Sequence, residues 1–326
     1  MNGKLLVIAF SIFTYAGALF SQVVEPEAKL RELNKDTLKG WYYGGLVGLN
    51  FSQVSLTNWA AGGENSLALN GLFSVFSNYK EEKMTWDNSL DVGYGFMVQG
   101  KKGVFIKTDD KFDALSKYGR KAFDNVYYAA LLNFKTQMSI GRDYKKDTSK
   151  ISNFMAPAYL IGALGMDYKP NSYLSAFAAP VTGKITFVED QDLADSGAYG
   201  VKPAVFDAQG NLIRHGETRK IEFGGYIRII YTKNDFATEA LKNVSLTSKI
   251  DLFSNYLKNP QNIDVSWENI IAFRVNKYIT FNISTHLLYD DDITINIDNN
   301  DDGIFDESGP RTQFKEILAV GFSYKF

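Results

Sequence analysis

The stretch TWDNSLDVGYGFMV, residues 85–98, alternates strictly between two kinds of side chain. One set of alternate positions is large and apolar, with only Asn88 intruding: Trp86, Leu90, Val92, Tyr94, Phe96 and Val98. The intervening positions are mainly small or polar, and include Asp87 and Asp91. Because successive side chains of a β-strand point to opposite faces, this period of two predicts a strand with one apolar and one polar face.

The same period recurs from Trp41 to the end of the 326-residue chain. It predicts an all-β fold, a transmembrane antiparallel up-and-down β-barrel of about 12 strands. The predicted strands are centred near residues 43–53, 66–79, 85–98, 107–118, 126–138, 154–169, 172–187, 221–232, 244–256, 263–275, 278–290 and 312–326. A soluble barrel with an apolar interior would show the same alternation. Twelve strands favour the membrane reading, because a barrel that wide has too large an interior for apolar side chains to fill.

The connections between the predicted strands alternate in length. Most links after even-numbered strands are short, as at Lys80 to Met84 and at Pro170–Asn171, whereas those after odd-numbered strands include the long segments Val188 to Lys220 and Asp291 to Arg311. Short periplasmic turns on one rim and longer extracellular loops on the other are typical of outer-membrane barrels. An even strand count places both chain ends at the short-turn rim.

Aromatic residues flank the short turns in pairs. The pairs are Tyr79 with Trp86, Tyr118 with Tyr128, and Tyr168 with Tyr173. Rings with a polar tip favour the boundary between lipid and water, so these residues are expected to form the periplasmic girdle. The last strand ends on Phe326, which resembles the terminal signal that the barrel-assembly machinery reads and predicts that machinery, and outer-membrane lipid, as partners.

The N-terminus has the features of a secretory signal. Lys4 precedes an apolar run from Leu5 to Phe10, and small residues follow at Ala16–Ala18. This pattern predicts a signal peptide over residues 1–21 and, with the strands above, localisation in the outer membrane. Residues 22–40 are expected to be a short periplasmic extension, and residues 41–326 the barrel.

Composition excludes several classes of function. The chain has no cysteine, so it forms no disulfide, thiolate metal site or cysteine nucleophile. Its formal net charge is −2 and it has no long basic block, which argues against a nucleic-acid partner.

The segment FSQVSLTNWAAGGEN, residues 51–65, resembles the signature of a family of outer-membrane proteins from Bacteroidota-type bacteria, catalogued as a domain of unknown function. The resemblance extends over most of the mature chain. Further matching segments are Trp86–Leu90, Leu132–Lys135, Gly165–Pro170, Asp251–Asn262 and Tyr289–Asp292. The resemblance implies localisation and architecture but no activity, ligand or catalytic residue.

One acidic segment matches part of a calcium-binding loop. Its oxygen donors are spaced at positions 1, 3, 5 and 9, with a glycine at position 6 and a backbone carbonyl at position 7. The candidate ligands are Asp298, Asn300, Asp302, Ile304 and Asp306. Position 12 is Gly309 where an EF-hand has a bidentate glutamate, and no helices flank the segment. Two interpretations remain open, a Ca²⁺ site that makes this outer loop rigid and a solvated acidic turn; no other cofactor is expected.

The sequence predicts no enzyme. The histidines are His215, in the longest loop, and His286, on a polar strand face with Ser284 two residues away. A hydrolase needs a nucleophile, a base and an orienting group in one cluster, and the sequence shows no such cluster. Three classes of function stay open: a narrow channel or transporter for small polar solutes, a closed accessory barrel that binds a protein or lipid partner through its outer loops, and a membrane-embedded lipid hydrolase. The first is preferred.

Overall fold

The computed structural model describes residues 39–55, 65–100, 103–143, 149–233, 236–274, 280–297, 307–321 and 324–325. The predicted signal peptide, residues 1–21, lies outside the described residues, as does nearly all of the predicted extension at 22–40. These two segments therefore stay predictions.

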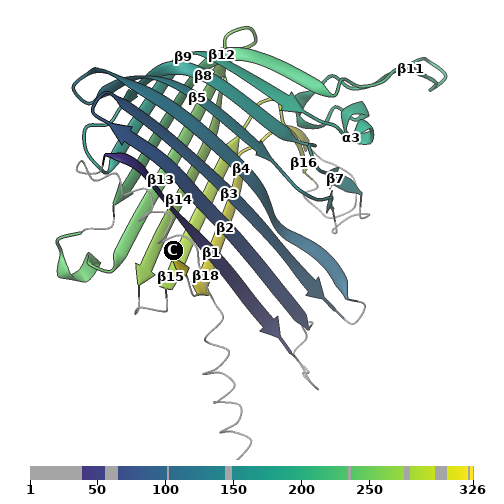
Figure 1. The fold of residues 1–326 in the computed structure, drawn as a ribbon. Coiled ribbons are helices and arrows are strands. Elements are labelled where there is room, and N and C mark those ends of the chain that lie inside the picture. The colour runs from purple at the N-terminus through teal and green to yellow at the C-terminus, as the bar shows by residue number, and fades with distance from the viewer. Residues whose placement is uncertain are drawn as a thin grey trace, which may run out of the picture.

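Twelve long strands form one antiparallel sheet in which each strand pairs with the next along the chain (Figure 1). They are β1 (Gly40–Val54), β2 (Ser66–Glu81), β3 (Met84–Gln99), β4 (Val104–Phe123), β5 (Val126–Thr136), β8 (Ala158–Tyr168), β9 (Leu174–Phe187), β12 (Arg219–Lys233), β13 (Val244–Asn255), β14 (Ile263–Arg274), β15 (Thr280–Tyr289) and β18 (Gln313–Gly321). The short β19 (Tyr324–Lys325) follows β18 and pairs with β1, with Leu46 opposite Lys325. The last segment of the chain therefore borders both β15 and β1, and the sheet closes. This confirms the predicted twelve-stranded up-and-down barrel.

The two rims differ as the link lengths predict. At the rim we call the turn end, strands are joined by short links such as residues 82–83, 124–125 and 169–173. At the opposite rim, the loop end, the links include residues 137–157 and 188–218. Both ends of the barrel chain lie at the turn end, because β1 begins there and β18 ends there, with Gly321 opposite Thr280, the first residue of β15.

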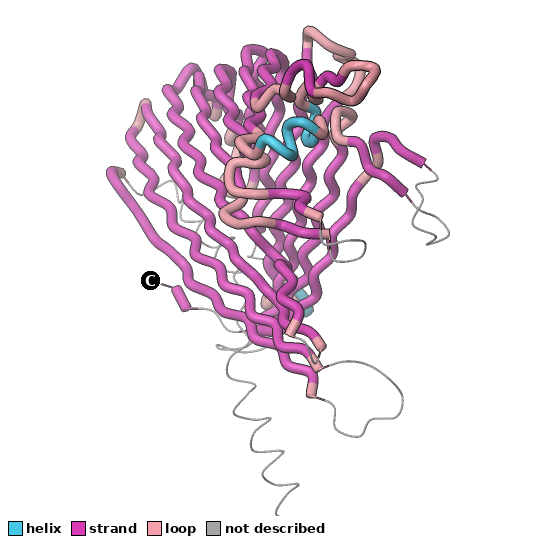
Figure 2. The backbone as a smooth tube through the Cα atoms, turned by 90° about the vertical axis from the view of Figure 1, so that its right-hand side faces the viewer, coloured by secondary structure: helices cyan, strands magenta, loops and turns pink. Residues whose placement is uncertain are grey.

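The connecting segments contain short elements that the period-two pattern does not reveal. At the loop end they form the hairpins β6–β7, β10–β11 and β16–β17 and the helices α3 and η1, which Figure 2 shows in front of the strands. Their bounds are β6 (Gly141–Arg142), β7 (Lys150–Ser152), α3 (Gln191–Asp195), η1 (Ala198–Gly200), β10 (Val205–Phe206), β11 (Leu212–Arg214), β16 (Thr294–Ile297) and β17 (Glu307–Pro310); η2 (Glu239–Leu241) lies in the link between β12 and β13. The predicted strand at 154–169 begins only at Ala158, because residues 153–157 form a tight turn with a cis Ala156–Pro157 bond.

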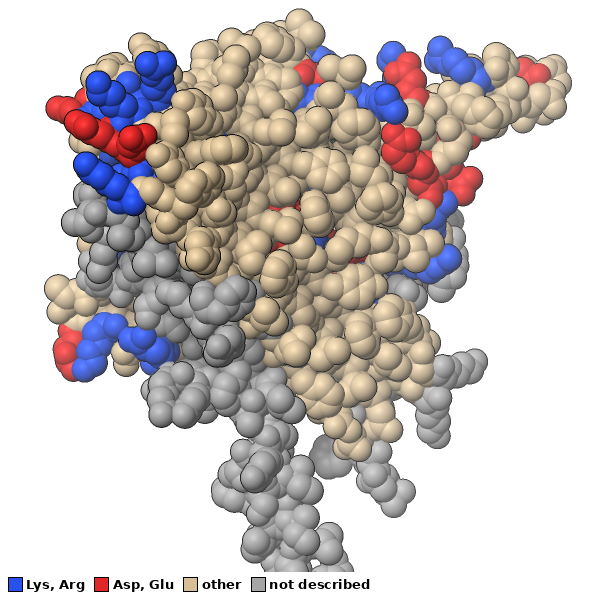
Figure 3. Space-filling model, viewed as in Figure 1, with Lys and Arg blue, Asp and Glu red and all other residues tan. Residues whose placement is uncertain are grey.

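The outer wall of the barrel is apolar. Large hydrophobic side chains are exposed on it, among them Leu49, Phe73, Trp86, Leu132, Leu164, Val181, Ile221 and Ile227. Figure 3 shows Lys, Arg, Asp and Glu gathered at two opposite ends of the molecule, with a band of other residues between them. Charged residues are instead buried inside the barrel, including Asp113, Lys117, Arg228 and Asp251. An apolar belt around a polar interior is the arrangement of a transmembrane barrel, so the direction of the alternation is settled. Among the described residues, none of the helices has the length and apolar character needed to span a bilayer.

Aromatic rings cluster on the outer wall at the turn end. Trp41 packs against Tyr79 and Trp86, with ring centroids 5.3 and 5.7 Å apart. Of the other predicted girdle residues, Tyr118, Tyr128 and Tyr168 are exposed on the same wall, and Tyr79 is partly exposed. Tyr173 is an exception to the predicted girdle, because it lines a cavity inside the turn end and lies under Lys233, whose Nζ is 4.0 Å from the ring centroid.

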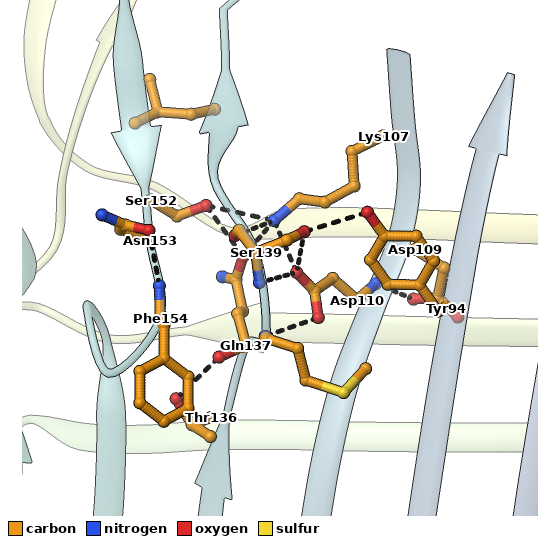
Figure 4. A network of polar contacts seen from close by, with 12 residues as sticks. Tyr94, Lys107, Asp109, Asp110, Thr136, Gln137, Ser139, Ser152, Asn153 and Phe154 are labelled. Atoms are coloured by element: carbon orange, nitrogen blue, oxygen red, sulfur yellow. Dashed lines mark hydrogen bonds and ion pairs between the residues drawn. The ribbon is translucent and has the colours of Figure 1, made fainter. Parts of the chain in front are cut away.

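A polar network anchors the β6–β7 hairpin to β4 at the loop end (Figure 4). β4 extends past the end of β5, and Asp110 on this overhang accepts hydrogen bonds from the backbone N–H groups of Met138 and Ser139 at 2.7 and 2.9 Å. Lys107 Nζ donates to Asp110 and to Gln137. The aspartate side chain is only 2% exposed, so these bonds compensate for its removal from water.

Candidate functional site

The inward side chains of the barrel form an interior of charged and polar groups. Asp167, Lys184, Glu222 and Lys249 are each less than 10% exposed although they carry charge. Burying one charged group costs roughly several kcal/mol unless the group is paired and hydrogen-bonded. The ion pairs inside the barrel therefore compensate for the burial of these charges.

Two ion pairs cross the lumen between strands that are not neighbours, and one of them joins opposite strands. Lys111 Nζ on β4 lies 3.9 Å from Glu268 Oε2 on β14, and five strands separate β4 from β14 in either direction around the barrel when β18 and β19 count as one. Lys135 on β5 reaches Asp251 on β13 at 3.7 Å. These contacts cross the lumen, so the interior of the barrel is bridged.

A stronger pair lies beside them within one wall. Arg228 donates to both carboxylate oxygens of Asp251, at 2.6 and 3.0 Å, and Tyr226 Oη donates to the same aspartate at 2.7 Å. Arg228 is on β12 and Asp251 faces it directly on β13. A planar guanidinium held by two bonds is pre-organised for a carboxylate, so this pair is a fixed part of the interior.

An apolar cluster fills another part of the lumen. Phe177, Tyr226 and Phe253 point inward from three neighbouring strands and pack with Leu131, and all four are at most 5% exposed. The Phe177 and Tyr226 rings meet edge to face, 6.3 Å between centroids. Aromatic packing and ion pairs together narrow the interior.

A cavity of about 230 Å³ opens inside the turn end. Its mouth is lined by polar residues of the turns, including Asn125 and Asn171. Toward the interior, Lys117 meets Asp167 at 2.6 Å and Lys169 meets Asp87 at 2.9 Å. The lining of the cavity thus combines charges of both signs, amide groups and hydroxyl groups with apolar side chains such as Val75, Phe76 and Leu115, a surface suited to a small molecule with both polar and apolar parts.

The structure places Ser266 beside His286, a contact that the sequence does not predict. His286 Nε2 lies 3.0 Å from Ser266 Oγ on the neighbouring strand β14. The serine that is close to His286 in the sequence is Ser284, on the same strand β15. Within the described part of the chain, no acid or amide hydrogen-bonds the other ring nitrogen. The geometry supplies two members of a catalytic triad and no orienting third group.

His215 lies in the long loop at the loop end. Its Nδ1 is 3.0 Å from Asp195 Oδ2, and the pair is exposed. Hydrogen bonds from His215, from the Gly216 N–H and from Gln191 lower the pKa of Asp195. These contacts fold the loop beside α3.

The sequence-predicted calcium ligands Asp298, Asn300, Asp302, Ile304 and Asp306 all lie outside the described residues. The flanking strands β16 and β17 pair, Ile297 opposite Glu307, so the segment joins the two strands of a hairpin. The calcium interpretation therefore stays a prediction. Residues 56–64 of the FSQVSLTNWAAGGEN segment are also outside the described residues.

Comparison with known families supports part of the resemblance. The family described as "Protein of unknown function (DUF3078)" matches residues 51–141. This span contains the FSQVSLTNWAAGGEN segment and the Trp86–Leu90 and Leu132–Lys135 segments. No curated protein matches the chain. A match to a family of unknown function is thus confirmed over residues 51–141, while the bacterial group and the resemblance beyond residue 141 stay predictions.

Three barrels are among the solved structures whose backbones are similar to this chain. The COG4313 outer membrane channel from Pseudomonas putida F1 is 10% identical, with a TM-score of 0.38, over 89% of this chain and 96% of that one. The translocator domain of the autotransporter NalP from Neisseria meningitidis is 9% identical, with a TM-score of 0.33, over 91% and 92%. The ferric-catecholate import receptor Fiu from E. coli K12 is 9% identical, with a TM-score of 0.26, and this chain spans 51% of its length. The fold assignment itself rests on the strand pairing above.

Proposed function

We propose that the protein is an outer-membrane barrel that passes small polar solutes through a narrow lumen, which ion pairs hold closed at rest. The apolar belt and the aromatic cluster at the turn end support its placement in outer-membrane lipid. The terminal strand that ends on Phe326 is the part that the barrel-assembly machinery would read.

One observation carries this proposal: the Lys111–Glu268 pair crosses the lumen while both side chains stay partly exposed, at 39% and 21%. Pairs in contact with water contribute only about 0–1 kcal/mol, so thermal motion or an entering solute separates them at low cost. The lumen is lined by charges, which a hydrated solute tolerates and an apolar one does not. The turn-end cavity would receive the solute, and its volume is below the roughly 300–1,000 Å³ of pockets for drug-sized ligands.

Planar-bilayer recording of the purified protein tests the proposal. We expect brief, small openings whose frequency rises with salt, because screening weakens exposed ion pairs. A membrane that stays silent at every salt concentration and voltage would contradict it.

A closed accessory barrel is the second candidate, and the β10–β11 hairpin favours it. The hairpin projects from the loop end (Figure 1), and Phe206 and Ile213 on it are 55% and 65% exposed. Silence in the bilayer would support this alternative. We keep the prediction that the protein is not an enzyme: if lipolytic activity were found and His286→Ala abolished it, that prediction would be wrong.

A further inference from the structure

Three carboxylates converge at the loop-end mouth of the barrel. Asp264 is the second residue of β14, and Asp290 and Asp291 follow directly after β15. One oxygen from each lies within 4.8 Å of the others. A cation that contacts oxygens at about 2.3–2.6 Å, as Ca²⁺ does, fits between groups at this spacing.

The nearest ammonium group does not neutralise all of these carboxylates. Lys184 Nζ lies 2.6 Å from Asp264, 3.7 Å from Asp290 and 3.6 Å from Glu222, and it hydrogen-bonds only Asp264. Asp291 accepts a hydrogen bond from the neutral amide of Asn262 at 2.7 Å. Lys184 therefore serves both Asp264 and Asp290, Glu222 shares it with Lys220, and Asp291 has only a neutral donor among the described residues.

A second observation points to a ligand in the same place. Glu222 is 3% exposed, and its Oε2 has no hydrogen-bond partner among the described residues. The other oxygen, Oε1, accepts from Lys220 and Asn255. Oε2 lies 3.6 Å from Lys184 Nζ, which also donates to Asp264, so this oxygen lies next to the acidic cluster although it is not one of the three that are within 4.8 Å of one another. A buried carboxylate oxygen without a donor is costly, and a bound cation would supply the missing partner.

The charge balance around the cluster also favours a bound cation. Among the described residues, the ion pairs and hydrogen bonds around the cluster connect five carboxylates to three lysines, which leaves a net charge of −2. The carboxylates are Glu222, Asp264, Asp290, Asp291 and Asp292, and the lysines are Lys184, Lys220 and Lys258. One divalent cation neutralises this excess.

We propose that the cluster is a Ca²⁺ site whose ligands are Asp264, Asp290, Asp291 and Glu222. Every donor is an oxygen, which favours a hard cation over zinc or copper. The site is distinct from the Asp298–Asp306 loop that the sequence indicates, and it does not depend on whether the lumen conducts. Its ligands come from β12, β14 and the segment after β15. Gly200 of the long loop packs so closely on Asp292 that an added Cβ would lie 2.9 Å from the Asp292 Cβ, so bound Ca²⁺ stabilises a point where loop and wall meet.

Isothermal titration of CaCl₂ into the folded full-length barrel, stripped with a chelator and held in detergent micelles, tests the site. We expect one saturable site in the wild type. Asp291→Asn should weaken it by about tenfold or more, because the affinity of calcium sites follows the number of charged ligands. Asp124→Asn makes the same charge change on a 95% exposed side chain at the turn end and should leave binding unchanged. Circular dichroism checks that each variant is folded, and Asp264→Asn replaces Asp291→Asn if the latter is not.

Asp302→Asn distinguishes the two candidate sites. Binding that persists in Asp302→Asn and weakens in Asp291→Asn supports the proposal. Binding that is lost in Asp302→Asn and kept in Asp291→Asn overturns it and places the ion in the Asp298–Asp306 loop. Absence of any saturable Ca²⁺ heat in the wild type overturns it as well.

Discussion

Lys111 and Glu268 approach to 3.9 Å from diametrically opposite strands of the barrel. The nearby Arg228–Asp251 pair is shorter, doubly hydrogen-bonded and far less exposed, at 5% and 10%. The first pair is of the weak, water-accessible kind and the second of the buried kind that is costly to break. The lumen thus contains one buried pair between neighbouring strands and one water-accessible pair between opposite strands.

Reversing the charge of Lys111 should open the lumen. Lys111→Glu replaces the attraction to Glu268 by repulsion between two carboxylates at roughly 5 Å, since glutamate is shorter than lysine, and like charges at that distance repel by roughly 1 to 3 kcal/mol depending on the local dielectric. We expect more frequent or larger bilayer currents than in the wild type. Lys121→Glu, an identical charge change near a turn, is the control and should behave as the wild type. If Lys111→Glu is as silent as the control, this pair does not close the barrel.

Removing the charge of Asp167 should destabilise the fold. The side chain is 2% exposed and pairs with Lys117 and Lys169, so Asp167→Asn leaves buried ammonium groups with less compensation. Breaking a buried pair in this way costs about 3–5 kcal/mol. Urea unfolding in lipid vesicles, followed by tryptophan fluorescence, measures the loss. Asp124→Asn should change stability by less than about 0.5 kcal/mol, and equal midpoints for the two variants would show that the Asp167 pairs contribute little.

The alternation of side chains was sufficient to predict the barrel strands but not the interior contacts. Residues 85–98 identify which side chains share a face, and the structure confirms that Asp87 and Asp91 point inward. Which lysine meets which carboxylate depends on barrel closure and strand register, which no local pattern contains. Lys111 and Glu268 are 157 positions apart, and the order of strands around the barrel brings them together.

Barrel closure and strand register also explain why the sequence does not predict the contacts around the candidate sites. Asp264 and Asp290 come from separate strands, so no loop motif connects them, whereas the Asp298–Asp306 spacing is visible because its candidate ligands are local. Ser266 pairs with His286 through register, while Ser284 was noticed because it is close in sequence. Tyr173 was assigned to the girdle from its position beside a turn, but a turn residue can face the lumen as easily as the lipid.

Two glycines on β8 should respond oppositely to substitution. A Cβ at Gly165 would lie 2.0 Å from the backbone oxygen of Ala178 on β9, where the strand register shifts, whereas a Cβ at Gly162 meets nothing within 4 Å. Gly165→Ala must therefore move backbone, and overpacking of this kind costs about 1–3 kcal/mol. Gly162→Ala should be neutral or slightly stabilising, because glycine within a strand is less favourable than alanine by roughly 0.5–1 kcal/mol. The midpoints of urea unfolding of the two variants measure this difference. A Gly165→Ala protein as stable as Gly162→Ala would contradict the close approach of β8 and β9.

The loop around α3 should loosen in acid. Asp190 precedes the helix and accepts hydrogen bonds from the Leu193 N–H, from Asn153 and from Lys150, the last also as an ion pair of 2.6 Å. Burial acts to raise the pKa of Asp190, but the bonds from Lys150, Asn153 and Leu193 outweigh it and lower that pKa. A carboxyl whose pKa is lowered in the folded state stabilises the fold above the ordinary aspartate range, and this contribution disappears as pH falls through the folded pKa. We expect hydrogen-exchange protection of residues 190–196, corrected for intrinsic rates, to be constant near neutrality and to fall in acid. Asp190→Asn should lower the protection at neutral pH and remove its pH dependence, whereas wild-type protection that stays level throughout the acid range would show that Asp190 does not hold the loop.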